Sequence, residues 1–128
     1  MRLWHEKLIP LLPRQQLLGQ HRECCALRGN GWGKPHSVVN YVFQYDRAKL
    51  VAYHVKVMTE MKNRGYNVDP LWLNVNYRGK LCSEDNYQNF SFCSYASPIY
   101  SEHNNNYLKE CVDNLSQKGI NINVNLCL

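Results

Sequence analysis

The short sequence GQHREC contains a glutamate whose small neighbours leave its carboxylate accessible to a reacting group. Glu23 is the only carboxylate in residues 7–45, a stretch that is otherwise basic or uncharged. In a helix, Gly19 lies one turn before Glu23 and Ala26 nearly one turn after it, so little side-chain bulk stands beside the carboxylate. A small neighbour lets another backbone approach closely. A surface acid paired with Arg22 or a lysine is the alternative interpretation.

Six cysteines are the other residues that could bind a metal or form disulfides. No two of them form a C-x-x-C pair and the zinc spacings are missing, so we expect no metal and no cofactor. Without secretion, disulfides are unfavourable, and most of the thiols are expected to be small buried apolar groups. Metal or redox use of the cysteines is the least favoured hypothesis. The six are Cys24, Cys25, Cys82, Cys93, Cys111 and Cys127.

The length of 128 residues predicts one domain, residues 1–128, that can bury a core without disulfides. The sequence has no run of twenty apolar residues, so we expect no membrane span. The start MRLWHEKLIPLLPRQQ has Glu6 and two prolines among its apolar residues and lacks a small-residue cleavage site, so it does not read as a signal peptide. We therefore expect a cytoplasmic protein, and a monomer.

Positive charge is concentrated in the first half of the chain. Residues 1–64 hold 11 Lys and Arg against 4 Asp and Glu, whereas residues 65–128 hold 4 against 6. A basic half indicates an anionic partner, with nucleic acid the commonest candidate. A solvated basic face with no such partner is the alternative.

Three helices are predicted to position these residues. They cover about residues 14–27, 46–64 and 104–118, because apolar residues recur there at helical spacing. Asp46 is suited to cap the second helix and Gly65 to follow its end. The predicted apolar stripes are Leu17, His21, Cys24 and Cys25; Leu50, His54, Val57, Met58 and Met61; and Leu108, Cys111, Val112 and Leu115.

The segments between the helices have no persistent period. Residues 1–13 are expected to form an extended arm, because two prolines oppose a helix there. The β-branched stretch 34–45 favours an extended conformation, residues 66–101 are predicted to be long loops, and residues 122–128 alternate in a way that suits an extended tail. The predicted fold is mainly α: a single compact domain of about three long helices with substantial loops and an N-terminal arm packed near the first helix.

The order of these segments resembles the pyrimidine-dimer DNA glycosylases, the phage endonuclease V-like enzymes. The resemblance spans nearly the whole chain and weakens toward its end. It is carried by MRLW, QQLLGQHREC, YDRAKLVAYHVKVMTEMKNRGYNV and, more faintly, PIYSEHNNNYLKECVDNLSQKGI. The chain is more similar still to an uncharacterised bacterial branch that keeps stretches like LLPRQQLLGQHRE and GWGKPHS.

The resemblance implies a specific repair chemistry without a cofactor. In this family the α-amine of the first residue attacks C1′ of a damaged nucleotide and displaces the base, and the Schiff base then permits β-elimination that nicks the strand. Carried onto this sequence, the nucleophile is Met1 and the essential acid is Glu23. Arg2 matches the basic residue after the nucleophile, Arg22 the arginine before the acid, and Gln15 a polar residue near the lesion.

Elementary chemistry suits these roles. An α-amine has a pKa of about 7.7–8.0, so a useful fraction is unprotonated at neutral pH, and Arg2 would lower that pKa further by repulsion. Glu23 could stabilise the cationic sugar and move protons. Leu3 and Trp4 would fix the arm by burial. Because removal of an initiator methionine normally needs a small second residue, we expect Met1 to stay and to supply the amine.

The sequence also departs from the phage pattern. Ala26 stands where that pattern has a further arginine, and the tail NINVNLCL replaces an aromatic and basic one. Both features help to grip the lesion in the family, so lyase chemistry is better supported than recognition of pyrimidine dimers. The preferred substrate could be another lesion or an abasic site.

DNA is expected to contact the basic half of the chain. The loop GNGWGKPH combines glycines that admit phosphates with a tryptophan that could wedge or stack between bases; an ordinary interhelical loop with a buried tryptophan is the alternative. The predicted function is a DNA glycosylase with abasic-site lyase activity, and a noncatalytic nucleic-acid-binding module on the same scaffold is the runner-up. The candidate contacts are Arg2, Arg14, Gln15, Arg22, Arg28, Trp32, Lys34 and His36, with Lys49 and Lys56 as weaker candidates.

Overall fold

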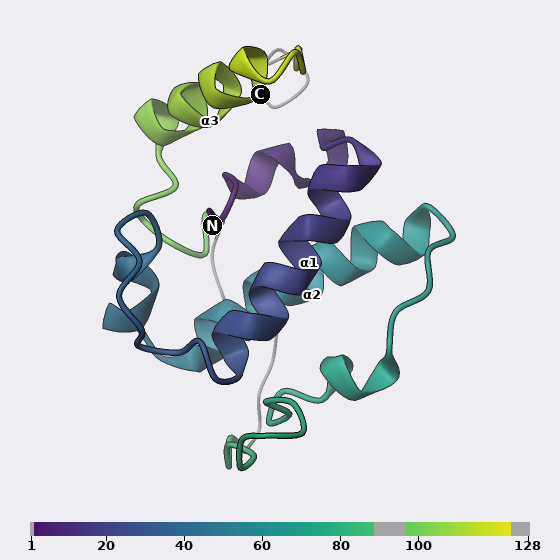
Figure 1. Cartoon of the computed structure of the whole chain (residues 1–128), viewed down its shortest axis with the longest axis vertical. Coiled ribbons are helices and arrows are strands. Elements are labelled where there is room, and N and C mark those ends of the chain that lie inside the picture. Colours follow the sequence, from purple (N-terminus) through teal and green to yellow (C-terminus); the bar gives the residue numbers. More distant parts are fainter. Residues whose placement is uncertain (1, 89–96, 124–128) are drawn as a thin grey trace.

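The computed structural model describes residues 2–88 and 97–123, and in these residues it is all-helical (Figure 1). This confirms the predicted mainly α fold with three main helices. None of the described helices is both long enough and apolar enough to cross a membrane. In chain order the elements are η1 (Glu6–Leu11), α1 (Arg14–Arg28), η2 (Asn40–Gln44), α2 (Arg47–Asn63), η3 (Pro70–Leu73) and α3 (Asn105–Gln117), where η marks a 3-10 helix.

Helices α1 and α2 pack across one another and form the centre of the molecule (Figure 1). The α2 stripe predicted from the sequence is buried throughout, from Leu50 to Met61. Each such apolar side chain contributes about 1.5–3 kcal/mol when it is fully buried. Asp46 occupies the N-cap position of α2 as predicted, but its side chain makes no capping hydrogen bond. Gly65, with φ of 81°, follows the end of α2, as predicted.

Helix α3 lies apart from the α1–α2 pair and covers the N-terminal segment (Figure 1). It begins where the Asn104 side chain accepts a hydrogen bond from the Tyr107 backbone N–H at 2.9 Å. Its inward face buries Leu108, Cys111 and Leu115. Gly119, with φ of 81°, follows its end. The predicted third helix is therefore confirmed to within a residue at each end.

Two predicted extended segments instead form 3-10 helices. In the arm, η1 turns Leu8 and Ile9 into the core, and a six-residue 3-10 helix accommodates Pro10. In the β-branched stretch, Val39 and Val42 are both fully buried, and their spacing of three residues matches one 3-10 turn. No described strand pairs with this stretch, so its backbone groups bond locally. Residues 124–128 of the predicted extended tail lie outside the described residues.

Candidate functional site

The start of the chain meets the acid of α1. The backbone N–H of Arg2 donates a hydrogen bond to Glu23 Oε2, with an N–O distance of 3.3 Å. Glu23 lies in the third turn of α1 and is partly exposed. Its other oxygen, Oε1, accepts no hydrogen bond from the described residues. Met1, the predicted nucleophile, lies outside the described residues, but the peptide bond joins it directly to the nitrogen that Glu23 contacts.

Gln20 organises this junction from the interior. Its side chain is 1% exposed. The amide nitrogen donates to Arg2 O at 2.9 Å and to Glu23 Oε2 at 3.2 Å. The amide oxygen accepts from the Trp4 backbone N–H at 2.7 Å and from the Tyr53 hydroxyl at 2.9 Å. One buried side chain therefore fixes the arm to α1 and orients the carboxylate of Glu23.

Burial and the third helix hold the arm in place as well. Leu3 is fully buried and Trp4 is 6% exposed, as expected for the residues that pin the arm. The Tyr107 hydroxyl of α3 donates to Leu3 O. The Arg2 guanidinium donates to Glu110 Oε1 of α3 at 3.2 Å. Residues 2–4 are thus fastened to all three main helices, since the Tyr53 hydroxyl of α2 also donates to Trp4 O.

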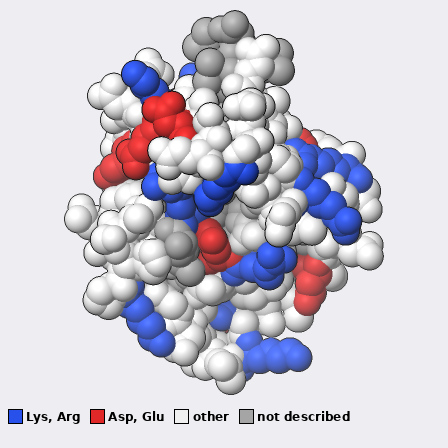
Figure 2. All heavy atoms as spheres, turned by 45° about the horizontal axis from the view of Figure 1, so that its top comes forward, with Lys and Arg blue, Asp and Glu red and all other residues white. Residues whose placement is uncertain are grey.

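A pocket of about 260 Å³ opens beside Glu23. This volume lies just below the range of about 300–1,000 Å³ typical of ligand pockets, so it suits one sugar ring better than a whole dinucleotide lesion. Figure 2 shows an acidic group near the centre of one face with Lys and Arg side chains around it. The pocket is lined by Arg2, Trp4, Glu23, Val38, Asn114 and Lys118.

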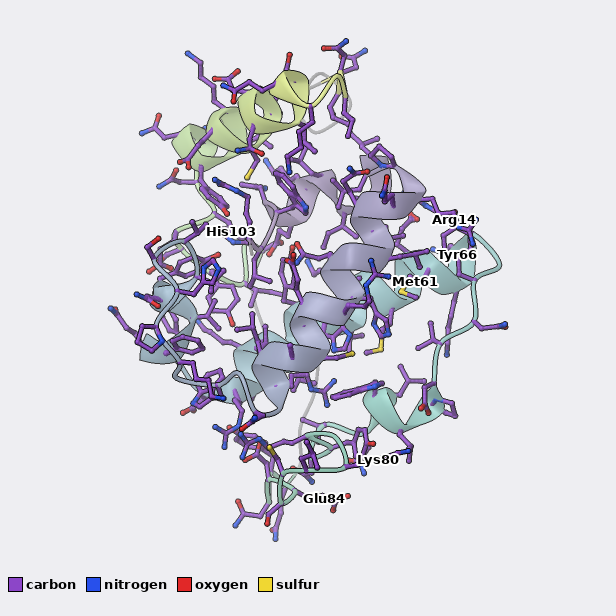
Figure 3. The ribbon with its side chains drawn as sticks, in the orientation of Figure 1. Arg14, Met61, Tyr66, Lys80, Glu84 and His103 are labelled. Atoms are coloured by element: carbon purple, nitrogen blue, oxygen red, sulfur yellow. The ribbon has the colours of Figure 1, made fainter. Side chains whose placement is uncertain are left out.

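Most of the predicted DNA contacts are accessible. Arg14, Gln15, Arg22, Lys34 and His36 are exposed. Of these, Arg14 lies over the Tyr66 ring, with 5.3 Å between its guanidinium carbon and the ring centroid (Figure 3).

Two further candidates, Trp32 and Lys56, already interact with other side chains of the protein. Trp32 is half-buried against Phe43, and the Arg47 guanidinium lies over its ring, so it is not free to insert between bases in this conformation. Lys56 donates to the buried carboxylate of Glu6 at 3.0 Å.

Arg28 departs from the predicted set because it is buried. It is 1% exposed, and its guanidinium donates to the carbonyl oxygens of Trp72 and Asn74, both at 2.8 Å, and of Tyr77 at 2.9 Å. The planar guanidinium, with five N–H donors in a fixed fork, suits this role because it can bind several carbonyl oxygens at once. Arg28 therefore fastens residues 72–77 to α1, and we leave it out of the proposed phosphate contacts.

A His–His–Cys group lies at the crossing of α1 and α2. His21 Nδ1 is 2.8 Å from His54 Nε2, and Cys25 Sγ lies 3.9 Å from His54 Nε2. A guanidinium nitrogen of Arg28 is 3.0 Å from His54 Nδ1. Arginine can only donate, so Nδ1 accepts and the proton of neutral His54 sits on Nε2, where a metal would have to bind. The geometry therefore favours a hydrogen-bond chain from Arg28 through His54 to His21 over a cation site.

Several residues of the site were not singled out from the sequence. Gln20 had a usable signal: it is a polar residue between Leu17 and Cys24 on the buried side of α1, where an amide needs partners. Asn114 and Lys118 had none, because their place at the pocket depends on how α3 packs against the arm.

Comparison with known proteins agrees with the geometry. A family model described as pyrimidine dimer DNA glycosylase matches residues 1–74, which include the arm, α1 and α2. No curated protein and no solved structure gave a match. The family match spans more than half of the chain and contains both Arg2 and Glu23. The chain belongs to the pyrimidine dimer DNA glycosylase family.

Proposed function

We propose that this protein is a DNA glycosylase with abasic-site lyase activity that acts through its N-terminal amine. The observation that carries the proposal is the contact of 3.3 Å between the Arg2 backbone nitrogen and Glu23 Oε2. It holds the beginning of the chain beside an acid, at the mouth of a pocket that suits a sugar ring. Family membership supplies the substrate class, damaged DNA, with a pyrimidine dimer or a related lesion as the target.

In the proposed reaction, the unprotonated Met1 amine attacks C1′ of the target nucleotide. The bond from C1′ to the base breaks, the base leaves with the bonding electrons and takes up a proton, and the attacking nitrogen loses a proton. The nitrogen lone pair then expels O4′ from C1′, O4′ takes up a proton, and the opened sugar is held as an iminium. Loss of a proton from C2′ then expels the 3′ phosphate, which nicks the strand. Glu23 Oε1 points to no described partner and is free to stabilise the cationic sugar or to carry these protons.

The hydrogen bonds of Glu23 support this role. Both described donors, the Arg2 N–H and the Gln20 amide, contact Oε2. The carboxylate is therefore oriented by one oxygen and open at the other. A carboxylate that is already oriented needs little rearrangement when the reaction takes place.

The DNA-binding side of the proposal rests on exposed cations of α1 and of the loop that follows it. Arg14, Arg22 and Lys34 are the proposed phosphate contacts, with Gln15 and His36 as polar neighbours. Three such cationic contacts predict an affinity that falls with rising salt concentration, because each neutralised phosphate releases about one counterion. A kinked duplex with a flipped nucleotide would bring C1′ to the pocket.

Borohydride trapping tests the proposal. Untagged protein is mixed with a duplex that contains an abasic site or ultraviolet damage, and borohydride is added. We expect a covalent adduct that is lost when an uncleaved tag blocks the N-terminus, although DNA binding is kept. Glu23→Gln should suppress strand cleavage at nearly unchanged affinity, whereas Glu84→Gln, the same change at an exposed loop residue (Figure 3), should leave cleavage intact. A protein that binds damaged DNA without any adduct would be the noncatalytic module instead.

A further inference from the structure

Leu81 is the most exposed large apolar side chain among the described residues. It is 90% exposed, and Leu71 follows at 50%. Leu81 forms a turn with Lys80, which Figure 3 shows at the outer end of the molecule, away from the core. A single exposed leucine is common on protein surfaces and has no meaning by itself. Leu81 is unusual because the loop that carries it, residues 76–87, is tightly fixed at its base.

The two ends of this loop are joined to each other and to α2. The Asn76 side chain donates to Tyr87 O at 3.2 Å and accepts from the Tyr87 backbone N–H at 2.7 Å. The Asp85 carboxylate accepts from Nε and Nη2 of Arg47, the first residue of α2, at 2.9 and 2.6 Å. A loop fixed in this way needs little ordering when its tip binds a partner.

The same loop contacts the segment GNGWGKPH that follows α1. Arg78 Nε donates to Arg28 O at 2.7 Å, and Arg78 Nη2 donates to Gly29 O at 3.2 Å. A Cβ built on Gly29 would lie 2.8 Å from Arg78 O, so the two backbones touch and a larger residue would force them apart. The turn at Leu81 therefore lies next to the segment that carries predicted DNA contacts, Lys34 and His36.

Positive charge gathers where the two loops meet. None of the ion pairs between described residues includes Arg28 or Arg78, which donate mainly to backbone carbonyl oxygens. The Lys80 ammonium makes no hydrogen bond or ion pair with any described residue. The exposed acid Glu84 lies farther along the loop, so cations are the charges nearest Leu81 in the chain. An apolar side chain beside free positive charge suits duplex DNA, in which phosphates flank a stack of bases.

One duplex is long enough to meet both the candidate site and this turn. Glu23 and Gly29 lie about 9 Å apart along α1, at a rise of about 1.5 Å per residue. The chain from Arg78 to Leu81 spans at most about 10 Å. Leu81 therefore lies within about 30 Å of Glu23, which is fewer than about ten base pairs of DNA at about 3.4 Å each.

We propose that Leu81 inserts between stacked bases near the lesion while Lys80 binds an adjacent phosphate. Apolar side chains that enter a base step unstack it and kink the duplex, and an opened stack lets the target nucleotide turn out toward the site. Leu81 is a binding residue in this scheme, since it touches the bases and not the reacting atoms. The proposal rests on the proposed function and adds to it a turn that lies outside the matched residues 1–74.

Unstacking can be measured without any reaction. A duplex carries the fluorescent base 2-aminopurine at positions on either side of an abasic site, and the protein carries Glu23→Gln so that the strand stays intact. In this background we expect the fluorescence to rise on binding, to stay near that of free DNA with Leu81→Ala, and to rise again with Leu81→Met, which keeps an apolar wedge. Leu71→Ala is the matched control and should behave like its parent. Truncation at a side chain this exposed leaves the core untouched.

Single-turnover cleavage by the otherwise wild-type protein gives the second readout. Leu81→Ala should lower kcat/KM on a fully paired abasic duplex by about tenfold or more, and should lose little on a duplex whose bases beside the abasic site are unpaired, because that stack is already open. Lys80→Gln should reduce the salt dependence of binding by about one counterion.

Two results would overturn the inference. They are a Leu81→Ala variant that matches Leu71→Ala in fluorescence and cleavage, which would leave protein docking as the use of this turn, and an equal loss on the paired and unpaired duplexes. Failure of the wild type to form a borohydride adduct would instead overturn the proposed function, and the fluorescence measurement would still decide whether Leu81 enters the stack.

Discussion

Replacement of Gln20 by methionine removes the one side chain that ties the arm to the acid. Methionine has nearly the same length but no amide, so the change isolates the hydrogen bonds from the packing. Two groups lose their described partner entirely: the Trp4 backbone N–H and the Arg2 carbonyl. The Tyr53 hydroxyl keeps its bond to Trp4 O, and Glu23 keeps its bond to the Arg2 N–H.

The expected cost follows from this count. A buried polar group left without a partner costs about 1–3 kcal/mol, so two such groups predict a loss of about 3 kcal/mol in the free energy of unfolding. For a domain of this size that corresponds to a fall in Tm of about 10 °C. The rate of adduct formation at a temperature where the variant is still folded should fall by about a hundredfold, because the amide that orients both the arm and the Glu23 carboxylate is gone.

Chemical denaturation and trapping of Gln20→Met and Gln16→Met measure both effects. Gln16 lies one turn earlier on α1 and makes no hydrogen bond in the described structure, so it is the matched control. Equal stability and equal trapping of the two variants would refute the role given to Gln20. A large loss of stability with an unchanged trapping rate would show that Gln20 supports the fold but does not position the amine.

Three further predictions follow from other residues. Gly19→Ala should raise the free energy of unfolding by up to about 1 kcal/mol, because alanine favours the helix and the added Cβ meets only an Arg22 nitrogen at 3.8 Å; thermal unfolding checks this, and a destabilised variant would contradict it. Arg28→Met should lower that free energy by about 3 kcal/mol or more and increase hydrogen exchange in residues 72–77, which lose their donors; unchanged exchange there would contradict the anchoring role. Burial lowers the pKa of His103 to about 3, so below about pH 6.5 the unfolded chain takes up a proton that the folded chain does not, and the free energy of unfolding falls by about 1.4 kcal/mol per pH unit. Denaturant titrations from pH 7 to 5 should show a shallower fall for His103→Gln than for the wild type. Equal slopes would contradict this assignment.

The sequence predicted the helices and the acid better than the connections. The stripe from Leu50 to Met61 repeats at helical spacing, and Gly65 follows the helix. Both the period and a glycine suited to a positive φ could therefore be recognised in the sequence. The stretch around Val39 and Val42 was read as extended because its residues are β-branched. Its spacing of three residues belongs to a 3-10 turn, which propensity alone does not distinguish.

Some residues of the site could likewise be predicted from the sequence and others could not. Glu23 could be found because it stands alone in a basic stretch between small neighbours, and the resemblance to a known family added the chain start. Arg28 looked like one more surface cation, since nothing local says that its guanidinium reaches three carbonyl oxygens some 45 residues away in the chain. Lys118 depends on the packing of α3 against Trp4, and no spacing in the sequence encodes that contact.

The position of the trapped sugar on the protein tests the central claim most directly. Wild-type protein is reduced with borohydride on an abasic duplex, digested, and mapped by mass spectrometry, which also shows whether Met1 is retained. The account predicts that the deoxyribose remnant is found on the α-nitrogen of Met1. A remnant on a lysine side chain, with the terminal amine unmodified, would contradict it.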